Sequence, residues 1–215
     1  MLFRSMANLT FYTNPMSRGR IARWMLEEVG ADYDTVYLSY DDTMKSRDYL
    51  EINPMGKVPA IKHGETVVTE CAAICAYLAD AFPDANLASP TDQRGDYYRW
   101  LFFAAGPVES AILNKALNIN TEGNEQTAGY GSFETMHATL IKAVSDTPFV
   151  CGDEFTAADV YVGSQIGWGL QFGTMPTSPE LEAYRDRVYA RPAYARATEI
   201  DNAAMVEHGP AMPGE

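Results

Sequence analysis

Residues 53–61 read NPMGKVPAI, and the second proline of this stretch interrupts a run that otherwise resembles a strand. A proline inside a strand removes a backbone donor, so Pro59 favours an edge strand or a deliberate break in the backbone. If the bond between Val58 and Pro59 is cis, the N–H and C=O of Val58 face outward and can pair with the backbone of a peptide ligand. If it is trans, Pro59 belongs to an ordinary edge strand. The residues alone leave both alternatives open.

A second segment with suitable chemistry begins at Thr69 and reads TECAAI. It predicts the start of a helix, where free backbone N–H groups and the positive end of the dipole favour a bound carboxylate. The Glu70 side chain would take an ammonium group, and the N–H and thiol of Cys71 would face the carboxylate. The pair therefore suits an α-amino acid, and plain capping of the helix by Glu70 is an equally good interpretation.

The elements that must position these segments alternate in type through the first third of the chain. Strand-like stretches at 9–13, 33–38 and 66–68 are interleaved with helical spacing at 17–29, which Gly30 ends, and at 70–81. The turn at 63–65 joins the Pro59 segment to the strand at 66–68. This order predicts a small α/β domain that contains both candidate segments.

Beyond residue 83 the composition shifts, and strand signals disappear. We expect a linker at 84–92, rich in Pro, Asp, Asn and Ser, and then only helices, at 92–118, 130–147, 156–170, 179–190 and 192–206. The predicted organisation is an α/β domain at 1–83, an all-helical domain at 93–206 and a flexible tail at 207–215.

Composition excludes several classes of function. The chain has 215 residues and a formal net charge of −13, which argues against a nucleic-acid partner. Three cysteines cannot all pair and form no CxxC, so we expect a reducing compartment. The three histidines are too scattered for a metal set, and we expect no metal. No apolar run reaches about 18 residues, so we expect a cytoplasmic protein with no membrane partner.

The segments NPMGKVPAI and TECAAICAYL, in this order, closely resemble the glutathione-binding domain of the cytosolic glutathione transferases. A third stretch, GDEFTAAD at 152–159, is similar to a structural motif of that family's C-terminal domain, and its Thr156 and Asp159 form a capping box. The resemblance spans nearly the whole chain. It implies a thioredoxin-like α/β N-terminal domain followed by an all-α C-terminal domain, with glutathione as a co-substrate.

The resemblance also implies roles for individual residues. Ser17 looks like the serine of bacterial-type, serine-type members, which stabilises the glutathione thiolate at the start of the first helix. Tyr12, Thr13 and Asn14 remain candidates for that role, and Ser17 could instead be a plain N-cap. The expected glutathione contacts are Arg18, Lys57, Val58, Pro59, Glu70 and Cys71, where the family usually has serine at the position of Cys71.

An apolar electrophile would lie against the helices, and the implied pocket consists of Trp100, Phe103, Trp168 and Phe172 together with Pro107. Aromatic residues at helical spacing are also typical of a plain core. The resemblance implies a homodimeric glutathione transferase that takes part in detoxification by attacking hydrophobic electrophiles. Two alternatives stay open: a non-catalytic protein that binds ligands or partners on the same fold, and a glutathione-dependent isomerase or peroxidase.

Overall fold

The computed structural model describes residues 8–40 and 42–209. They form two compact units. The sheet unit comprises the described residues up to Ala85 together with those from Pro192 onward, and the helical unit is Asn86–Arg191. This division differs from the predicted domains, because the last helix, which we had placed in the helical domain, packs against the first helix. Of the predicted tail, 210–215 lies outside the described residues.

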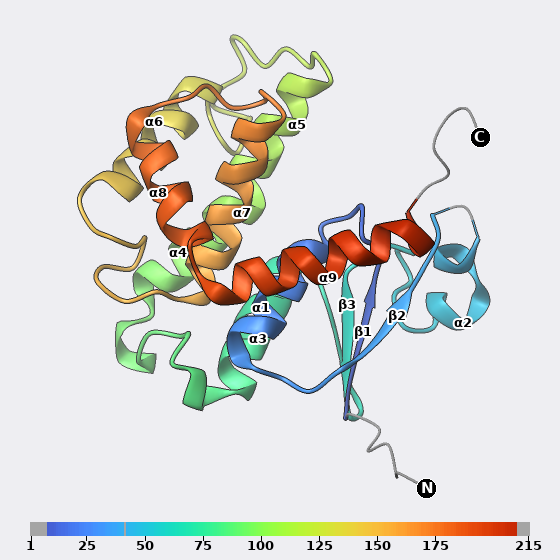
Figure 1. The fold of residues 1–215 in the computed structure, drawn as a ribbon. Helices are drawn as coiled ribbons and strands as arrows, with labels where there is room; N and C mark the ends of the chain where they lie inside the picture. Colours follow the sequence, from blue (N-terminus) through green and yellow to red (C-terminus); the bar gives the residue numbers. More distant parts are fainter. Residues whose placement is uncertain (1–7, 41, 210–215) are drawn as a thin grey trace, which may run out of the picture. The chain divides into compact units, whose positions relative to one another are not determined.

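A mixed four-stranded sheet forms the centre of the sheet unit (Figure 1). Its strands are β1 (Leu9–Thr13), β2 (Asp34–Tyr37), β3 (Ala60–His63) and β4 (Thr66–Thr69), in the order β2-β1-β3-β4. β2 runs parallel to β1, whereas β3 is antiparallel to both β1 and β4. The sheet confirms the predicted α/β fold of the N-terminal part.

Helices cover both faces of this sheet. On one face, α1 (Gly19–Val29) packs against α3 (Cys71–Ala81), and α1 ends at Gly30 in the left-handed conformation, as predicted. On the other face lie the short helix α2 (Arg47–Leu50) and the 3-10 turn η1 (Thr43–Lys45), which the sequence did not reveal. Because successive side chains of a strand point to opposite faces of the sheet, the side chains of β1 are shared between these two layers.

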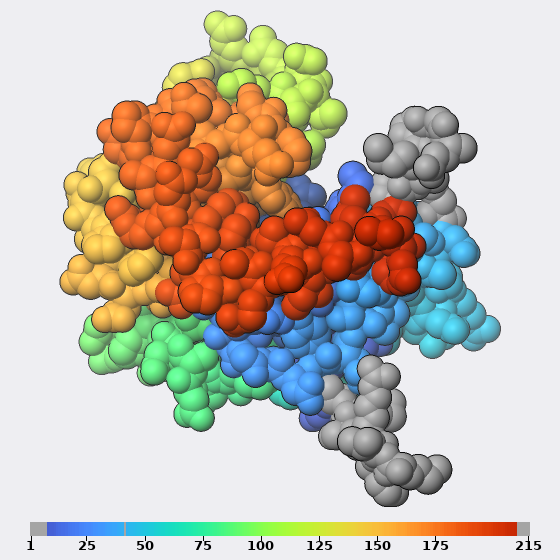
Figure 2. All heavy atoms as spheres, viewed as in Figure 1, coloured from blue at the N-terminus to red at the C-terminus, as the bar shows by residue number. Residues whose placement is uncertain are grey.

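The C-terminal helix α9 (Pro192–His208) lies along α1. The outer side of α9 forms part of the surface in Figure 2. A buried ion pair joins the two helices, with 2.9 Å between Arg23 Nε and Asp201 Oδ1. The same guanidinium donates to the hydroxyls of Tyr33, Thr35 and Tyr37, each at 3.2 Å. The ion pair, which links residues 178 positions apart, ties α9 to the sheet unit.

The helical unit contains α4 (Gly95–Phe103), the π-helical turn η4 (Ala104–Val108), α5 (Glu109–Ala116), α6 (Phe133–Ser145), α7 (Ala157–Gln171) and α8 (Pro179–Tyr189). Short 3-10 turns at Pro83–Ala85 and Thr91–Gln93 accompany the predicted linker. The predicted helix at 92–118 is thus formed by α4, η4 and α5 in succession, and its backbone widens into a π-helical turn around Pro107.

Helix α7 is the centre of this unit, with nearly all of its side chains buried. It begins with the predicted capping box, in which Thr156 N donates to Asp159 Oδ2 at 2.9 Å and the Thr156 hydroxyl accepts from the start of the helix. Asp159 also accepts from Val150 N and from the Tyr184 hydroxyl. Among the described residues, no helix is both long enough and apolar enough to cross a membrane.

Candidate functional site

The register of the sheet brings the predicted site segments to the same end of the strands. Tyr12 lies opposite Ala60, and Ala60 lies opposite Thr69. The chain after β1, the chain before β3 and the chain after β4 therefore leave the sheet at the same end, because β3 is antiparallel to its neighbours. A hydrogen bond joins the first and third of these segments, since the Cys71 thiol donates to the Arg18 C=O with 3.5 Å between sulfur and oxygen.

Ser17 is half-buried in the turn that precedes α1. Its Oγ donates to the Asn14 C=O at 2.7 Å and accepts from Gly19 N at 2.9 Å. Helix α1 has Arg18 at its N-cap position with no side-chain cap, and the Ser17 hydroxyl instead accepts from the first N–H of the helix, so a capping role for Ser17 stays open beside the thiolate contact. The hydroxyl can donate to a ligand only after its proton turns away from the Asn14 C=O.

Close packing holds this turn in place. A Cβ added at Gly19 would lie 1.9 Å from Thr13 Oγ1 and 2.9 Å from Ser17 Oγ, so a larger residue would displace both side chains. The requirement for glycine here comes from this close approach rather than from backbone conformation.

The other candidates for the thiolate contact have structural partners. Thr13 is fully buried. Asn14 is held at both ends of its amide, since Nδ2 donates to the Leu38 C=O at 2.8 Å and Oδ1 accepts from Met16 N at 2.9 Å. Tyr12 points to the opposite face of the sheet from α1, where its ring lies 5.6 Å from that of Tyr49. Of the four candidates, Ser17 is the one whose side-chain oxygen is bonded to the first N–H of α1 and belongs to a partly exposed residue.

Nearby cations take different positions. Arg18 is exposed. Arg20 Nε donates to the Pro15 C=O at 2.6 Å, and its Nη1 donates to Asn202 Oδ1 at 2.9 Å. Arg20 therefore braces the turn against α9, and we assign no ligand contact to it.

A network of hydrogen bonds holds the loop before β3. The Lys57 C=O accepts from the Tyr49 hydroxyl at 2.5 Å and from Asn53 Nδ2 at 2.8 Å, and the Gly56 C=O accepts from Lys45 Nζ at 2.7 Å. Burial raises the pKa of the Tyr49 hydroxyl to about 12, so it remains a donor at neutral pH. Sequence reasoning missed Tyr49 and Lys45, whose role depends on folding of the segment at 43–50 against this loop.

The peptide bond between Val58 and Pro59 is cis, which was one of the two alternatives. Within 8–40 and 42–209, neither the N–H nor the C=O of Val58 has a hydrogen-bond partner. Lys57 is exposed beside them, and Pro59 is buried. At this end of the sheet, Val58 therefore offers one backbone donor and one backbone acceptor, and the hydrogen bonds of the preceding loop hold it in place.

Glu70 joins β4 to α3 in a backbone conformation that is unusual for its type, with φ 64° and ψ 119°. Its side chain is exposed. Cys71 is the first residue of α3 and only 7% exposed. The turn therefore presents a carboxylate next to the positive end of a helix, which suits the ammonium and carboxylate groups of an amino acid.

The predicted aromatic pocket is gathered only in part. Trp100 is buried within the helical unit, and its ring meets that of Phe103 edge-on with 5.5 Å between centroids. Trp168 is half-buried on α7, and Phe172, just after that helix, is 70% exposed. In the described chain, no ring contact links Trp168 or Phe172 to the first two residues. No group of three or more His, Cys, Asp or Glu residues in the described chain is placed to hold a metal ion.

Comparison with known proteins agrees with this geometry. The family model described as "Glutathione S-transferase, N-terminal domain" matches residues 7–80. The chain is 28% identical over 176 residues to glutathione S-transferase GstA of Escherichia coli O157:H7, and the alignment covers 78% of this chain and 86% of that protein.

Solved structures extend the similarity to the helical unit. The glutathione transferase from Methylococcus capsulatus strain Bath has a TM-score of 0.73 and 27% identity, covering 91% of this chain and 99% of its own. A sphingomonad glutathione S-transferase complexed with glutathione has a TM-score of 0.74 and 26% identity, covering 90% and 98%. The chain is therefore similar to the glutathione S-transferases in both units, with a thioredoxin-like N-terminal domain and a helical remainder.

Proposed function

We propose that this protein is a glutathione transferase that activates the glutathione thiol as a thiolate for attack on a hydrophobic electrophile. The observation that carries the proposal is the backbone of Val58, whose N–H and C=O pair with nothing among the described residues and lie at the end of the sheet between the segments of Ser17 and Glu70. A tripeptide needs such a backbone pair for its central residue, together with groups for its two charged ends.

The proposed roles follow the chemistry of glutathione. Val58 pairs with the backbone of the cysteinyl residue, and Glu70 takes the ammonium of the γ-glutamyl end. The N–H of Cys71, at the start of α3, faces the carboxylate of that same end. The positive charges of Lys57 and Arg18 attract the glycyl carboxylate. Val58 and Pro59 thereby place the glutathione sulfur on the side of Ser17.

In the chemical step, the thiol loses its proton to solvent, and the Ser17 hydroxyl donates a hydrogen bond to the sulfur that remains. The nearby start of α1 also favours the anion. The thiolate then forms a carbon–sulfur bond to the electrophile, and the leaving group departs with the electron pair of the broken bond. Trp100, Phe103, Trp168 and Phe172 remain the predicted contacts of the electrophile. We also propose a cytoplasmic homodimer.

The first experiment is calorimetric titration of the protein with reduced glutathione at neutral pH. We expect micromolar to low-millimolar binding that Glu70→Ala weakens at least about tenfold, the loss of one charge-assisted hydrogen bond. Glu65→Ala is the matched control, because Glu65 is an exposed carboxylate in the turn at the opposite edge of the sheet. Equal loss in both variants would contradict the assignment of Glu70.

The second experiment measures conjugation with 1-chloro-2,4-dinitrobenzene, which loses chloride when the thiolate adds. Ser17→Ala should lower kcat/KM by roughly 10- to 100-fold, which corresponds to a hydrogen bond to a charged group. Ser145→Ala, in an exposed helical position of the other unit, should change nothing. An unchanged rate in Ser17→Ala would rule out its role.

One alternative has an observation in its favour. The Ser17 proton is engaged with the Asn14 C=O, and Cys71 stands where the family usually has serine, so a non-catalytic protein that binds ligands on this fold is the second candidate. Retained binding of glutathione with no turnover across a broad panel of electrophiles would favour it.

A further inference from the structure

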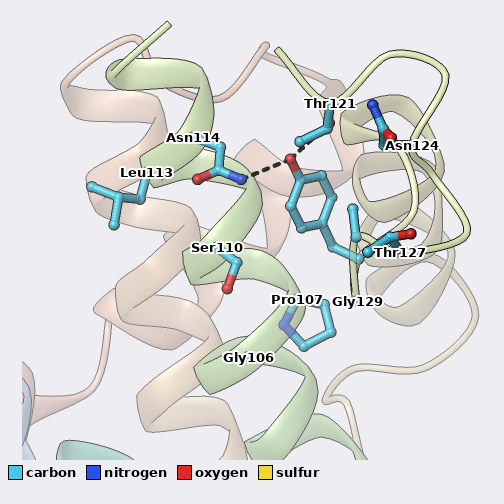
Figure 3. A pocket seen from close by; sticks show the side chains of 11 residues that line it. Gly106, Pro107, Ser110, Leu113, Asn114, Thr121, Asn124, Thr127 and Gly129 are labelled. Carbon is cyan, nitrogen blue, oxygen red and sulfur yellow. Dashed lines mark hydrogen bonds between the residues drawn. The ribbon is translucent and has the colours of Figure 1, made fainter. Parts of the chain in front are cut away.

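A pocket of about 530 Å³ opens in the helical unit, and of the residues of the predicted apolar pocket it contains Pro107 but none of the four aromatic residues. One wall is the continuous helix through η4 and α5, from Gly106 to Asn114, and the other is the loop from Thr121 to Tyr130 (Figure 3). Volumes of roughly 300–1000 Å³ are typical of sites for small molecules. The proposed glutathione site shares no residue with this pocket, and Pro107 is the one lining residue that the sequence analysis had named.

Local backbone structure forms the cavity. Pro107 lies inside the helix within the π-helical turn Ala104–Val108, a wider turn that often marks functional positions. Gly106 and Gly129 stand on opposite walls, and a Cβ added at either would meet nothing within 4 Å. The space between the walls is therefore left open by small residues.

The loop wall is tied to the helix. Ile119 N donates to the Asn114 C=O at 2.8 Å, and the Asn114 side chain donates to the Tyr130 hydroxyl at 3.0 Å. Tyr130 also exchanges a hydrogen bond with Thr121 Oγ1 at 3.0 Å. Figure 3 shows the bond from Asn114 to Tyr130 crossing between helix and loop, and the bond between Thr121 and Tyr130 joining the two ends of the loop. The pocket is thus preformed rather than assembled by a ligand.

The lining decides which ligands fit. None of its eleven residues, all in the described part of the chain, carries a charge, and small or apolar groups cover much of the wall. In a protein with a net charge of −13, an anion would find neither a cationic partner here nor a favourable field. The pocket therefore suits an uncharged molecule.

Counting protons defines the polar contact. The hydroxyls of Tyr130 and Thr121 hold two protons, and one proton lies between the two oxygens whichever residue donates. The atom of Asn114 that faces Tyr130 is Nδ2, which only donates and so does not take up the second proton. In either arrangement one O–H is left to donate to a ligand.

We propose that this pocket binds an uncharged, largely apolar small molecule that accepts one hydrogen bond, such as a ketone, lactone or ether with one or two rings. The acceptor oxygen bonds to the hydroxyl pair of Thr121 and Tyr130. The apolar rings lie against Pro107 and the glycine and alanine surface. This inference stands independently of the glutathione site.

The test uses coumarin, a neutral bicyclic lactone, in equilibrium dialysis against the full chain. We expect a Kd of about 1 mM or tighter, in line with a ligand of this size. Coumarin-3-carboxylate, with nearly the same ring system and a negative charge, should bind at least about tenfold more weakly. The double variant Thr121→Val/Tyr130→Phe should also bind coumarin about tenfold more weakly.

A matched pair of variants locates the site. Ser110→Phe places a ring in the pocket from an exposed helical position, and it should abolish binding. Ser145→Phe makes the same change on an exposed position of α6, and it should leave binding unchanged. The proposal is overturned if the unmodified chain does not bind coumarin, if Ser110→Phe binds it normally, or if the carboxylate binds equally well.

Discussion

The backbone at Glu70 predicts opposite effects of one substitution on stability and on binding. A residue other than glycine at φ 64° and ψ 119° carries strain of about 1–3 kcal/mol. Glycine adopts this conformation without strain, but it loses about 0.5–1 kcal/mol more conformational entropy on folding. The difference leaves a net gain, so we expect Glu70→Gly to raise the free energy of unfolding by about 1 kcal/mol. The same change removes the carboxylate that we assign to the ammonium of glutathione.

Urea unfolding at pH 7 measures the first effect, and calorimetry with reduced glutathione measures the second. Glu70→Ala is the informative control, because it removes the carboxylate and keeps the strain, so it should lose binding without gaining stability. Glu65→Gly controls for glycine alone, since Glu65 has no positive φ, and it should be neutral or destabilising. If Glu70→Gly destabilises the protein, the strain argument is wrong. If it binds glutathione normally, the assignment of the site is wrong.

Three further predictions concern buried groups. Asp201→Ala should lower the free energy of unfolding by about 3–5 kcal/mol because it leaves Arg23 buried without its carboxylate, and Arg23→Met/Asp201→Leu should lose much less. Urea unfolding of the single and double variants measures the losses, and a loss in the double variant equal to the sum of the losses in the single variants would contradict this. Asp159→Ala should lower it by about 3 kcal/mol, since Tyr184 and the start of α7 lose their acceptor, and an effect below 1 kcal/mol would refute the role. Burial raises the pKa of Cys151 to about 12 from 9.0, so its thiol should resist iodoacetamide at pH 8 until the chain unfolds, as peptide mass spectrometry can show. Because the folded pKa is the higher one, this thiol's contribution to stability is lost as the pH rises from 9.0 to about 12.

Local patterns predicted many of the elements. The spacing at 17–29 and the glycine after it predicted α1 and its end at Gly30, and Thr156 with Asp159 predicted the start of α7. The sequence did not predict the segment at 43–50, because a four-residue helix leaves no periodic pattern to read. Tyr49, which holds the Lys57 C=O, was missed for the same reason.

The assignment of α9 to the sheet unit could not be made from the sequence. The pattern at 192–206 predicted a helix, but a helix shows only that one side is apolar and not which surface it meets. The contact depends on the pairing of Arg23 with Asp201 across a long stretch of chain. The pocket between α5 and the following loop is likewise absent from any local pattern, because its walls meet through Asn114 and Tyr130.

By itself, the sequence determined most of the element types, the resemblance to the glutathione transferases and the segments of the candidate site, since those depend on neighbours along the chain. Only the tertiary structure decided that the bond before Pro59 is cis, that no residue in the described chain pairs with the backbone of Val58, and that Glu70 takes a positive φ. It also directed the Ser17 proton to the Asn14 C=O. These features depend on hydrogen bonds and close contacts between segments, and no local preference specifies them because several conformations of each loop satisfy its own sequence equally well.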